Sequence, residues 1–598
     1  MRGRVSRRRS ARPSTSAPRP IRPLANPTTL MTPPSSPGSK SAFGTATLIA
    51  LPIAGSIVWL ATLQLRAFNG DVNPDGISYI ELAKLFSRGD ASALSNGYWS
   101  PLYPITVAIA LRLADLWPGA SPTELSVVLA TNLVVFGLAA LAITRLVRVL
   151  VLAGREGTST GIVILRASVV AVLCIWSLVR MIGVSTITPD ALLAIVLFLV
   201  TADLAEAADA SPTNRRAIAF GVLLGAGYWT KSVFLPVAVV AVGAYVLLGS
   251  RVSRRRLLAR SAVGLAIVAG PLVAVQSWSQ NHLSFGETGR LNYRWYVGGL
   301  DHAPPIHEPI SETRRRESPS TVALDAVPGT LLFKGDVAGS FPYWFDPSRF
   351  EPAGAGQVSL SAQWRTVRSN ALWFALTGLN LILLALIAFA MASRRGSPHW
   401  RRSLALLPSL ALLGLYALTN PTGRMGGAPI ACIVAIVATL VVSQTLIGRR
   451  PSLAVEYAAL GMLAVLLAGR TARRVPAGRA SAADKNSGAL LQAIRANGVN
   501  AGSAVGVIGL PFGNYWAHVA DVRFVVVITP SDTMRVLDED ALESVSRESA
   551  ARGQPISAVV WNRGARIQAP HARSLADGWS IWISDDRRSI PARRPSVQ

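Results

Sequence analysis

Four ionisable residues stand at the ends of long apolar runs, where a charged side chain is costly. Asp75 follows the first apolar run, and Asp190 lies between two later ones. Lys231 also lies between two runs, and Arg424 stands in a glycine-rich turn. Charges placed at a membrane in this way are candidates for function. A carboxylate can take a proton from a hydroxyl, and a lysine or an arginine can bind a phosphate.

Each of these residues also has a plain structural interpretation. Asp75 precedes a helical pattern, so it could simply cap that helix, with Ser78 three residues on. Pro189 can end one helix and Asp190 can cap the next. Lys231 could extend along the apolar surface to reach the membrane interface. The residues alone leave both interpretations open.

The segment after Asp75 predicts a short helix in the membrane interface. Apolar side chains recur at helical spacing there: Tyr79, Leu82, Ala83 and Phe86. Charged side chains fall on the other side: Glu81, Lys84 and Arg88. Such a helix would lie along the interface with its N-terminus beside Asp75. Asp71 would stand next to it, nearer the membrane exit.

The composition indicates a polytopic α-helical membrane protein. Of 598 residues, 51% are hydrophobic and 15% are charged, with a mean hydropathy of +0.38. The net charge of +27 falls in short clusters beside apolar runs, which indicates membrane topology and argues against a nucleic-acid partner. The two cysteines, Cys174 and Cys432, lie inside apolar runs and offer neither a disulfide framework nor a metal quartet.

Eleven apolar runs of membrane-spanning length recur along the chain, or twelve with the segment 102–117. They cover 43–65, 124–150, 162–182, 191–206, 217–231, 233–249, 261–278, 371–392, 403–418, 428–447 and 452–470. Arg112 and Asp115 interrupt 102–117, so we expect this segment to dip into the membrane without crossing it. Basic clusters at 215–216, 251–260, 394–402 and 449–450 can then all be cytoplasmic. This topology puts the N-terminus inside, and Asp75, Asp190, Lys231, Arg424 and the C-terminus outside a plasma (inner) membrane.

We expect three regions on this basis. Residues 1–40 are basic and rich in proline and serine, which predicts a disordered cytoplasmic tail. Residues 41–470 form the transmembrane domain, with external loops 66–100 and 279–370. Residues 471–598 have the composition of an external soluble domain, in which apolar runs such as 504–510, 524–528, 556–561 and 579–583 alternate with helical segments. That alternation predicts a small α/β domain. Its Gly506-x-x-Gly509 spacing lacks the pattern of a nucleotide site, so we expect a packing or acceptor-docking role.

The external loops are rich in aromatic residues. Tyr98-Trp99-Ser-Pro-Leu-Tyr-Pro has the character of a membrane-interface segment, and Asn-Tyr293-Arg-Trp295-Tyr lies in the loop 279–370. Tyr293 and Trp295 could stack on sugar rings or rest on lipid headgroups. His302 and His307 lie in the same loop but make a weak case for a metal site.

Taken as an ordered set, these motifs resemble the GT-C superfamily of polyprenyl-phosphate-sugar-dependent glycosyltransferases, nearest to the protein O-mannosyltransferase and aminoarabinose transferase branch. The resemblance spans roughly 43–450 and is carried by Asp75-Gly-Ile-Ser-Tyr79, the Tyr98–Pro104 run, Thr-Pro-Asp190, Gly-Tyr-Trp-Thr-Lys231 and Arg424. Two features depart from the family pattern. Gly76 replaces the second acid of an adjacent pair, which leaves the base assignment open, and Met425 stands where an aromatic residue is usual.

The resemblance implies an inverting transfer of a sugar from a polyprenyl-phosphate donor, in the bilayer, to a glycan, lipid or protein acceptor. Asp75 would be the general base, and Lys231 and Arg424 would stabilise charge on the phosphate. Asp71 and Asp190 would orient hydroxyls or hold a divalent metal ion, and Tyr79 would contribute to substrate binding. Two alternatives are a lipid-linked sugar flippase or transporter and an O-antigen-type ligase or polymerase.

Overall fold

The computed structural model describes residues 39–68, 70–116, 122–152, 160–210, 212–298, 321–335, 337–350, 359–370, 400–445, 487–509, 515–529, 537–562, 567–575 and 578–584. Most of the predicted tail 1–40, the runs 371–392 and 452–470, and both His302 and His307 lie outside these residues.

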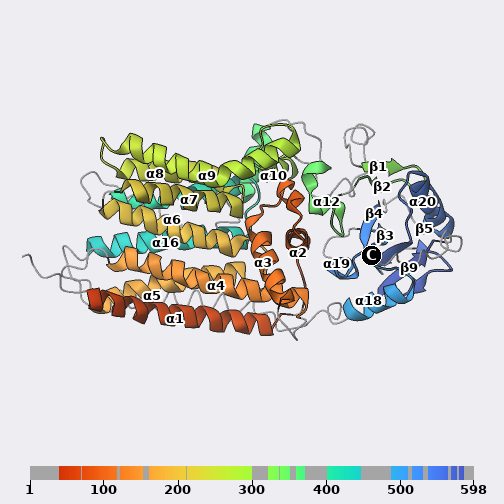
Figure 1. Ribbon diagram of the computed structural model, residues 1–598, viewed down its shortest axis with the longest axis horizontal. Coiled ribbons are helices and arrows are strands. Elements are labelled where there is room, and N and C mark those ends of the chain that lie inside the picture. Colours follow the sequence, from red (N-terminus) through yellow and green to blue (C-terminus); the bar gives the residue numbers. More distant parts are fainter. Residues whose placement is uncertain are drawn as a thin grey trace, which may run out of the picture. The chain divides into compact units, whose positions relative to one another are not determined.

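Long helices dominate the transmembrane region (Figure 1). They are α1 (Ser39–Arg66), α4 (Glu124–Val147), α5 (Thr160–Trp176), α6 (Asp190–Asp209), α7 (Asn214–Thr230), α8 (Phe234–Leu248), α9 (Arg254–Gln280), α15 (Leu407–Leu418) and α16 (Gly423–Thr445). Short turns extend three of them: π-helical η2 (Arg148–Leu152) and η3 (Ser177–Ile182), and α14 (Trp400–Ser403) with η5 (Leu404–Leu406). Among the described residues, four stretches are long and apolar enough to cross a membrane: 124–151, 190–209, 254–280 and 400–418. The predicted helical membrane fold is confirmed.

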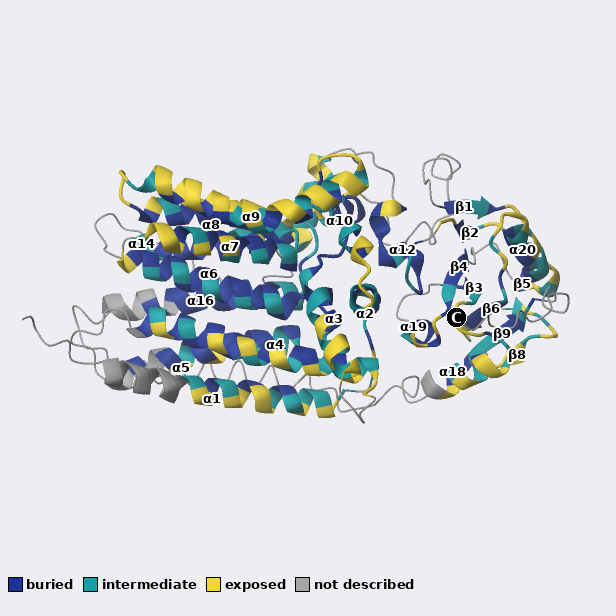
Figure 2. Ribbon diagram, in the orientation of Figure 1, coloured by how far each residue is buried: buried dark blue, intermediate teal, exposed yellow. Residues whose placement is uncertain are grey.

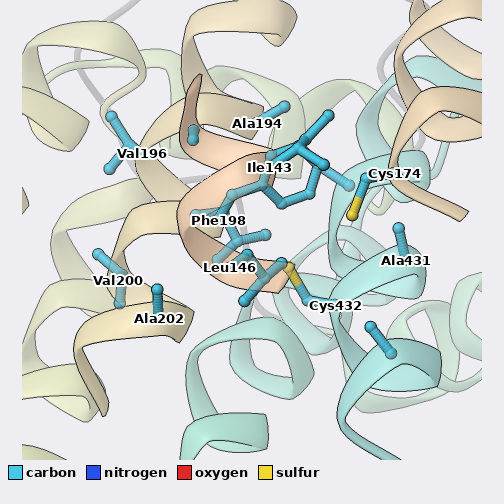
Figure 3. Close-up of a cluster of buried hydrophobic side chains, with 14 of the residues drawn as sticks. Ile143, Leu146, Cys174, Ala194, Val196, Phe198, Val200, Ala202, Ala431 and Cys432 are labelled. Carbon is cyan, nitrogen blue, oxygen red and sulfur yellow. The ribbon is translucent and has the colours of Figure 1, made fainter. Parts of the chain in front are cut away.

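Helix α6 forms the centre of the apolar core and α9 lies at its margin. Figure 2 shows α6 buried along its length, whereas α9 carries many exposed residues. Side chains from α4, α5, α6 and α16 meet in one cluster, among them Leu146, Phe198 and Cys432 (Figure 3). A helix that is apolar on all sides belongs inside a bundle, which explains the central place of α6.

Glycines let α7 and α9 pack with their backbones close together. A Cβ on Gly221 would lie 2.1 Å from the carbonyl oxygen of Ser261, and one on Gly264 would lie 2.3 Å from that of Ile218. Small residues at helix interfaces permit such approach inside a membrane. The packing fixes the position of the α7 C-terminus, where Lys231 follows.

A layer of short helices covers one end of the bundle in Figure 1. It contains α2 (Pro74–Ser87), η1 (Ala91–Ser95), α3 (Leu102–Asp115), α10 (Thr288–Tyr296), α12 (Pro342–Phe345) and η4 (Pro347–Arg349). The predicted helix after Asp75 is present as α2, but its predicted polar side is wrong at Glu81, which is buried because α2 is covered on both sides. Helix α3 has 14 residues and is about 21 Å long, shorter than a hydrocarbon core of about 30 Å. That length is compatible with the expectation that this segment dips into the membrane without crossing it.

The C-terminal region forms an α/β sheet domain, as its alternating pattern predicts. Its seven strands are ordered β1 (Thr321–Leu324), β2 (Thr330–Phe333), β4 (Arg523–Ile528), β3 (Ala504–Ile508), β6 (Ala558–Asn562), β9 (Trp579–Ile583) and β8 (Arg573–Ser574). The central β4, β3 and β6 are parallel, and the outer pairs are antiparallel. Helices α18 (Ser487–Ala496) and α19 (Tyr515–Ala520) share a core with one face, and α20 (Glu539–Ala551) shares a core with the other. A short pair, β5 (Leu537–Asp538) and β7 (Ile567–Gln568), lies beside them.

Two of these strands come from the loop 279–370. The hairpin β1–β2 joins the sheet because β2 pairs antiparallel with β4, over Thr330–Leu332 against Val526–Ile528. The sequence predicts this loop and the C-terminal domain as separate regions. The sheet therefore continues from a segment that precedes the last transmembrane helices in the chain.

Candidate active site

Asp75, Arg424, Asp190 and Lys231 form one chain of alternating charges. The Arg424 guanidinium donates a hydrogen bond from Nη2 to Asp75 Oδ2, and its Nε lies 3.6 Å from Asp190 Oδ2. Lys231 Nζ lies 2.5 Å from Asp190 Oδ1. The Asp190 side chain is 1% exposed, whereas those of Asp75 and Arg424 are 20% and 24% exposed. Four residues spread over 350 positions of sequence thus meet at one site.

Asp75 lies in the first turn of α2 and does not cap it. The N-cap is Asn73, whose side chain makes no capping hydrogen bond, and Ser78 donates its hydroxyl to the Trp344 carbonyl oxygen. The capping interpretation of Asp75 is therefore wrong. A Cβ on Gly76 would lie 2.9 Å from Ile187 Cβ, so the close approach of α2 to the Asp190 loop explains why no second acid stands at position 76.

Asp190 is the first residue of α6, and the N-cap is Pro189, so the capping interpretation is wrong here too. Its carboxylate accepts from Thr188 Oγ1 at 2.8 Å as well as pairing with the two cations. The loop before it is fixed by Asn132, whose Nδ2 donates to the Val184 carbonyl oxygen at 2.8 Å. Asn132 Oδ1 in turn accepts from the Tyr103 hydroxyl at 2.7 Å. Helices α3 and α4 thus hold this acid in place.

Lys231 follows the last residue of α7 in extended conformation. The chain turns sharply into α8 there, because Gly227 lets the Phe234 ring pack within 2.2 Å of where a Cβ would stand. The next residue, Ser232, donates its backbone N–H to Ser100 Oγ at 3.1 Å. The lysine ammonium therefore points to Asp190 from a turn that is held at both ends.

Arg424 is the second residue of α16. A Cβ on Gly427 would lie 2.6 Å from Met181 Cβ, so glycine lets this end of α16 pack closely against η3. The positive end of a helix is unfavourable for an arginine, and the two carboxylates offset that cost. The next residue, Met425, packs against the apolar core and also lines the cavity.

The four charges line a cavity of about 460 Å³ with aromatic walls. Tyr79, Tyr98, Trp99, Tyr293, Tyr296, Trp344 and Tyr416 contribute to its lining. The rings of Tyr98 and Trp99 meet edge to face with their centroids 4.4 Å apart, and the ring centroids of Trp99 and Trp344 are 5.6 Å apart. Burial and the charge of Asp75 raise the pKa values of Tyr79 and Tyr98, so both hydroxyls remain protonated donors. A cavity with a charged end and aromatic walls suits a ligand that has an anionic group and a polar ring.

The Tyr98–Trp99 segment is fixed by a network around Asn96. Asn96 Oδ1 accepts the backbone N–H groups of Tyr98 and Trp99 at 2.9 and 2.8 Å, and its Nδ2 donates to the Phe345 carbonyl oxygen at 2.7 Å. A Cβ on Gly97 would lie 2.5 Å from Ser348 Oγ. These contacts join the Tyr98 segment to α12 and η4, so the aromatic wall is preorganised.

The remaining predicted binding residues have different positions. Tyr293 lines the cavity, and its buried hydroxyl has no hydrogen-bond partner among the described residues. Trp295 does not line the cavity but packs behind its wall. Its ring centroid is 5.5 Å from that of Tyr98 and 6.1 Å from that of Trp344. Asp71 is exposed and is absent from the lining. The substrate roles proposed for these three residues stay predictions.

Sequence reasoning missed several lining residues. Tyr416 at the end of α15 and Thr422 in the turn before α16 have buried hydroxyls without hydrogen-bond partners among the described residues. Asn292 accepts from the Tyr98 hydroxyl at 3.1 Å. Tyr416 lies in an apolar run and Thr422 in a turn, where neither residue type stands out in the sequence. An unpaired buried hydroxyl beside a cavity is a feature that a bound ligand can satisfy.

The predicted metal ligands do not fit a divalent cation in this arrangement. Asp190 is already bonded to Lys231, Arg424 and Thr188, and Asp71 does not line the cavity. In the described part of the chain, no three His, Cys, Asp or Glu side chains are grouped as metal ligands. We therefore derive no step through a metal ion.

No family model matches the chain, and no curated protein matches it. Among solved structures, the crystal structure of ArnT from Cupriavidus metallidurans bound to undecaprenyl phosphate is similar, with 13% identity and a TM-score of 0.46. The match covers 90% of this chain and 98% of that chain. A likeness at this level carries no argument about activity.

The arrangement itself defines the chemistry that the site can support. The two acids and two cations balance in formal charge. Helices α2, α6 and α16 all begin at the cavity, so their N-terminal ends face it. Each helix N-terminus contributes roughly half a positive charge. The site therefore has a surplus of positive potential with a carboxylate, Asp75, beside it. Such a site can bind an anion and remove a proton from a neighbouring group.

Proposed function

We propose that this protein is a membrane glycosyltransferase that moves a sugar from a polyprenyl phosphate to an acceptor hydroxyl, with inversion at the anomeric carbon. The observation that carries the proposal is the cavity in which Asp75, Arg424, Asp190 and Lys231 alternate beside aromatic walls. A phosphate, a sugar ring and a hydroxyl each find a complementary group there. The family resemblance of the same residues in the sequence supports the same reaction.

The reaction is a single displacement. The acceptor oxygen forms a bond to the anomeric carbon while the bond from that carbon to the phosphate oxygen breaks. The electron pair leaves on the polyprenyl phosphate, and the acceptor proton passes to the Asp75 carboxylate. Lys231 and Arg424 stabilise the charge that develops on the phosphate.

Arg424 has two partners to exchange in this scheme. Its guanidinium contacts Asp75 and Asp190 in the present structure. A donor phosphate competes for this fork, because arginine binds phosphate through two parallel hydrogen bonds. Asp75 then loses its cation and becomes available to the acceptor. Asp190, which is buried, keeps Lys231 in place.

The donor and acceptor approach from different surroundings. A polyprenyl tail belongs in the bilayer beside the apolar helices, and the acceptor, a glycan, lipid or protein, comes from the external side of a plasma (inner) membrane. That sidedness rests on the basic clusters of the sequence, which place the N-terminus in the cytoplasm and the C-terminal domain outside. The aromatic walls suit a sugar ring.

Transfer by the purified protein in nanodiscs tests the proposal. Polyprenyl-monophosphate sugars are supplied with an acceptor extract, and both products, free polyprenyl phosphate and glycosylated acceptor, are measured by mass spectrometry. We expect one donor to give equal amounts of the two products. A flippase would move the donor across the bilayer intact. Movement of a donor without release of polyprenyl phosphate would therefore refute the transferase assignment.

A further inference from the structure

A second cluster of ionisable groups lies between α2 and the C-terminal sheet domain. His518 of α19 is 4% exposed, and its Nε2 lies 2.6 Å from Glu124 Oε1 of α4. Its Nδ1 lies 3.4 Å from Glu81 Oε1 of α2. The imidazole therefore has a carboxylate at each ring nitrogen. Only the protonated ring can donate to both.

A second segment of the sheet domain also reaches Glu81. Ser340 donates its backbone N–H to Glu81 Oε1, and its carbonyl oxygen accepts from Phe524 N of β4 at 2.8 Å. Gly339 before it has a φ of +104°, and a Cβ there would lie 2.7 Å from Glu81 Oε2. This left-handed conformation favours glycine. Glu81 is thus bound by two separate segments: α19, through His518, and the segment before α12, through Ser340.

The same helix carries Asp75 and Glu81. Asp75 and Tyr79 line the cavity, whereas Glu81 is six positions after Asp75 and contacts the sheet domain. At about 100° per residue these two carboxylates lie about 120° apart around α2, on different faces of the helix. The N-cap of α2 makes no side-chain hydrogen bond, so tertiary contacts must hold this end of the helix in place.

We propose that His518 is a positioning residue: held as an imidazolium between Glu81 and Glu124, it fixes α2, and with it Asp75, against α4 and the sheet domain. The proposal rests on the proposed transfer reaction only for its activity measurement. Without the positive charge, two carboxylates that are largely shielded from water would face each other across a neutral ring. Such a pair would repel, and the repulsion would push α2 away from α4.

The surroundings of His518 support a charged ring at neutral pH. Burial lowers the pKa of His518, but the hydrogen bonds and charges of Glu124 and Glu81 outweigh it and raise the pKa to about 9. The other groups in the cluster are Lys84 Nζ, 3.5 Å from Glu124 Oε2, and the Tyr515 ring, stacked 5.5 Å from the imidazole. The folded pKa exceeds the unfolded value of about 6.5. The stabilisation is therefore complete below about pH 6.5 and is lost as pH rises through about 9.

Amide hydrogen exchange on α2 and the pH dependence of transfer test this role together. The protein is kept in nanodiscs, and exchange of the amides 77–83 is measured at pH 7 and at pH 10, corrected for intrinsic rates. We expect His518→Gln to speed this exchange roughly ten- to a hundredfold at pH 7, since a hydrogen bond to a charged group is lost. Its kcat should fall with little change in KM, and the alkaline loss of activity near pH 9 should be absent from its profile.

A matched control is His571→Gln. Like His518, His571 pairs with a glutamate, but this one lies within the sheet domain: His571 Nδ1 is 2.9 Å from Glu539 Oε1. The His571 side chain is 85% exposed. This variant should exchange and transfer as the wild type does. Adding Glu81→Gln to His518→Gln removes one of the two facing carboxylates and should restore part of the protection of α2. If the two substitutions instead reduce the protection of α2 additively, His518 acts on α2 through packing and not through its charge, and the proposal is overturned.

The outcomes separate this proposal from the proposed function. Absent transfer by the wild type would defeat the glycosyltransferase assignment and leave the exchange measurement intact. Unchanged exchange of α2 in His518→Gln, or an alkaline limb that persists in it, would overturn the positioning role. If His518→Gln does not insert into the membrane, the wild-type protein alone tests the proposal. Its α2 amides must then lose protection from hydrogen exchange between pH 7 and pH 10, and unchanged protection would overturn the positioning role.

Discussion

Helix α6 has acidic residues at both ends, and the two ends are built differently. At its N-terminus, Asp190 has Lys231, Arg424 and Thr188 as partners and lines the cavity. At its C-terminus, Asp203, Glu206 and Asp209 pair with arginines of α4, α7 and α14: Arg145, Arg216 and Arg402. None of these C-terminal acids lines the cavity.

The helix dipole explains the difference. Acids at the C-terminal end of a helix are unfavourable, so each needs an arginine to offset the negative end of α6. Asp190 stands at the positive end, which already favours it, and yet two cations contact it. The positive charge at this end therefore exceeds what the acid requires. The ion pairs at the C-terminal end of α6 join helices and use all of their charge in doing so. The N-terminal end keeps an excess of positive potential, which is what a site that binds an anion requires.

The largest expected effect is at Asp75. Asp75→Asn keeps the size of the side chain but cannot accept the acceptor's proton, so the transfer rate should fall by roughly 10²–10⁴-fold. The matched control is Asp203→Asn at the other end of α6, which should lower stability and leave the rate per folded protein unchanged. The measurement is transfer from a polyprenyl-phosphate sugar, normalised to inserted protein. A rate above about a tenth of wild type in Asp75→Asn would remove it as the base.

The next effect is at Arg424. Arg424→Ala should cost about 2–4 kcal/mol of transition-state stabilisation, which corresponds to roughly 30- to 1000-fold in kcat. Arg424→Lys keeps the charge but loses the fork, so we expect an intermediate rate.

Arg402 provides a matched comparison for that substitution. Its Nε and Nη2 bond to the two oxygens of Asp209 at 2.8 and 2.9 Å, so it is also a fork. Arg402→Lys should shift the melting temperature slightly and leave turnover alone, because a partly exposed ion pair contributes about 0–1 kcal/mol. Equal loss of turnover in the two lysine variants would erase the distinction between the ends of α6.

The smallest effect is at Tyr416, whose hydroxyl lies beside the cavity with no partner in the described chain. Tyr416→Phe should leave stability unchanged, because no hydrogen bond of the free protein is lost. If the donor satisfies this hydroxyl, its KM should rise by about two- to tenfold, the value of one neutral hydrogen bond. Ser261 also has an unpaired buried hydroxyl, but outside the cavity lining, so Ser261→Ala should leave KM unchanged. A donor KM equal to wild type in Tyr416→Phe would show that the donor does not reach α15.

The charged members of the site could be found from the sequence because ionisable residues are rare beside apolar runs. Asp75, Asp190, Lys231 and Arg424 stood out for that reason, and the structure brings all four together. Glu81 was misplaced because helical periodicity assumes one covered side, whereas α2 has two. Tyr416 and Thr422 could not be found, since a hydroxyl in an apolar run or a turn has the same appearance whether or not it faces a cavity.

The helical membrane fold and the α/β character of the C-terminal region followed from periodicity and composition. The hairpin β1–β2 did not, because its four-residue strands depend on pairing with β4, far along the chain. Likewise nothing local to His518 indicates that it meets Glu81 and Glu124. Short strands and buried ion clusters are decided by long-range contacts, which a pattern within one segment does not contain.

The pairing of the β1–β2 hairpin with the C-terminal sheet has a consequence for biogenesis. Strand β2 ends at Phe333, while β4, its partner, begins at Arg523. During synthesis the hairpin has no β4 to pair with until α15, α16 and then β4 itself have been translated. Pairing over such a sequence separation is slow. A strand translated after α15 and α16 thus completes a unit begun before them, so a chain that stops before β4 would leave that hairpin without its partner.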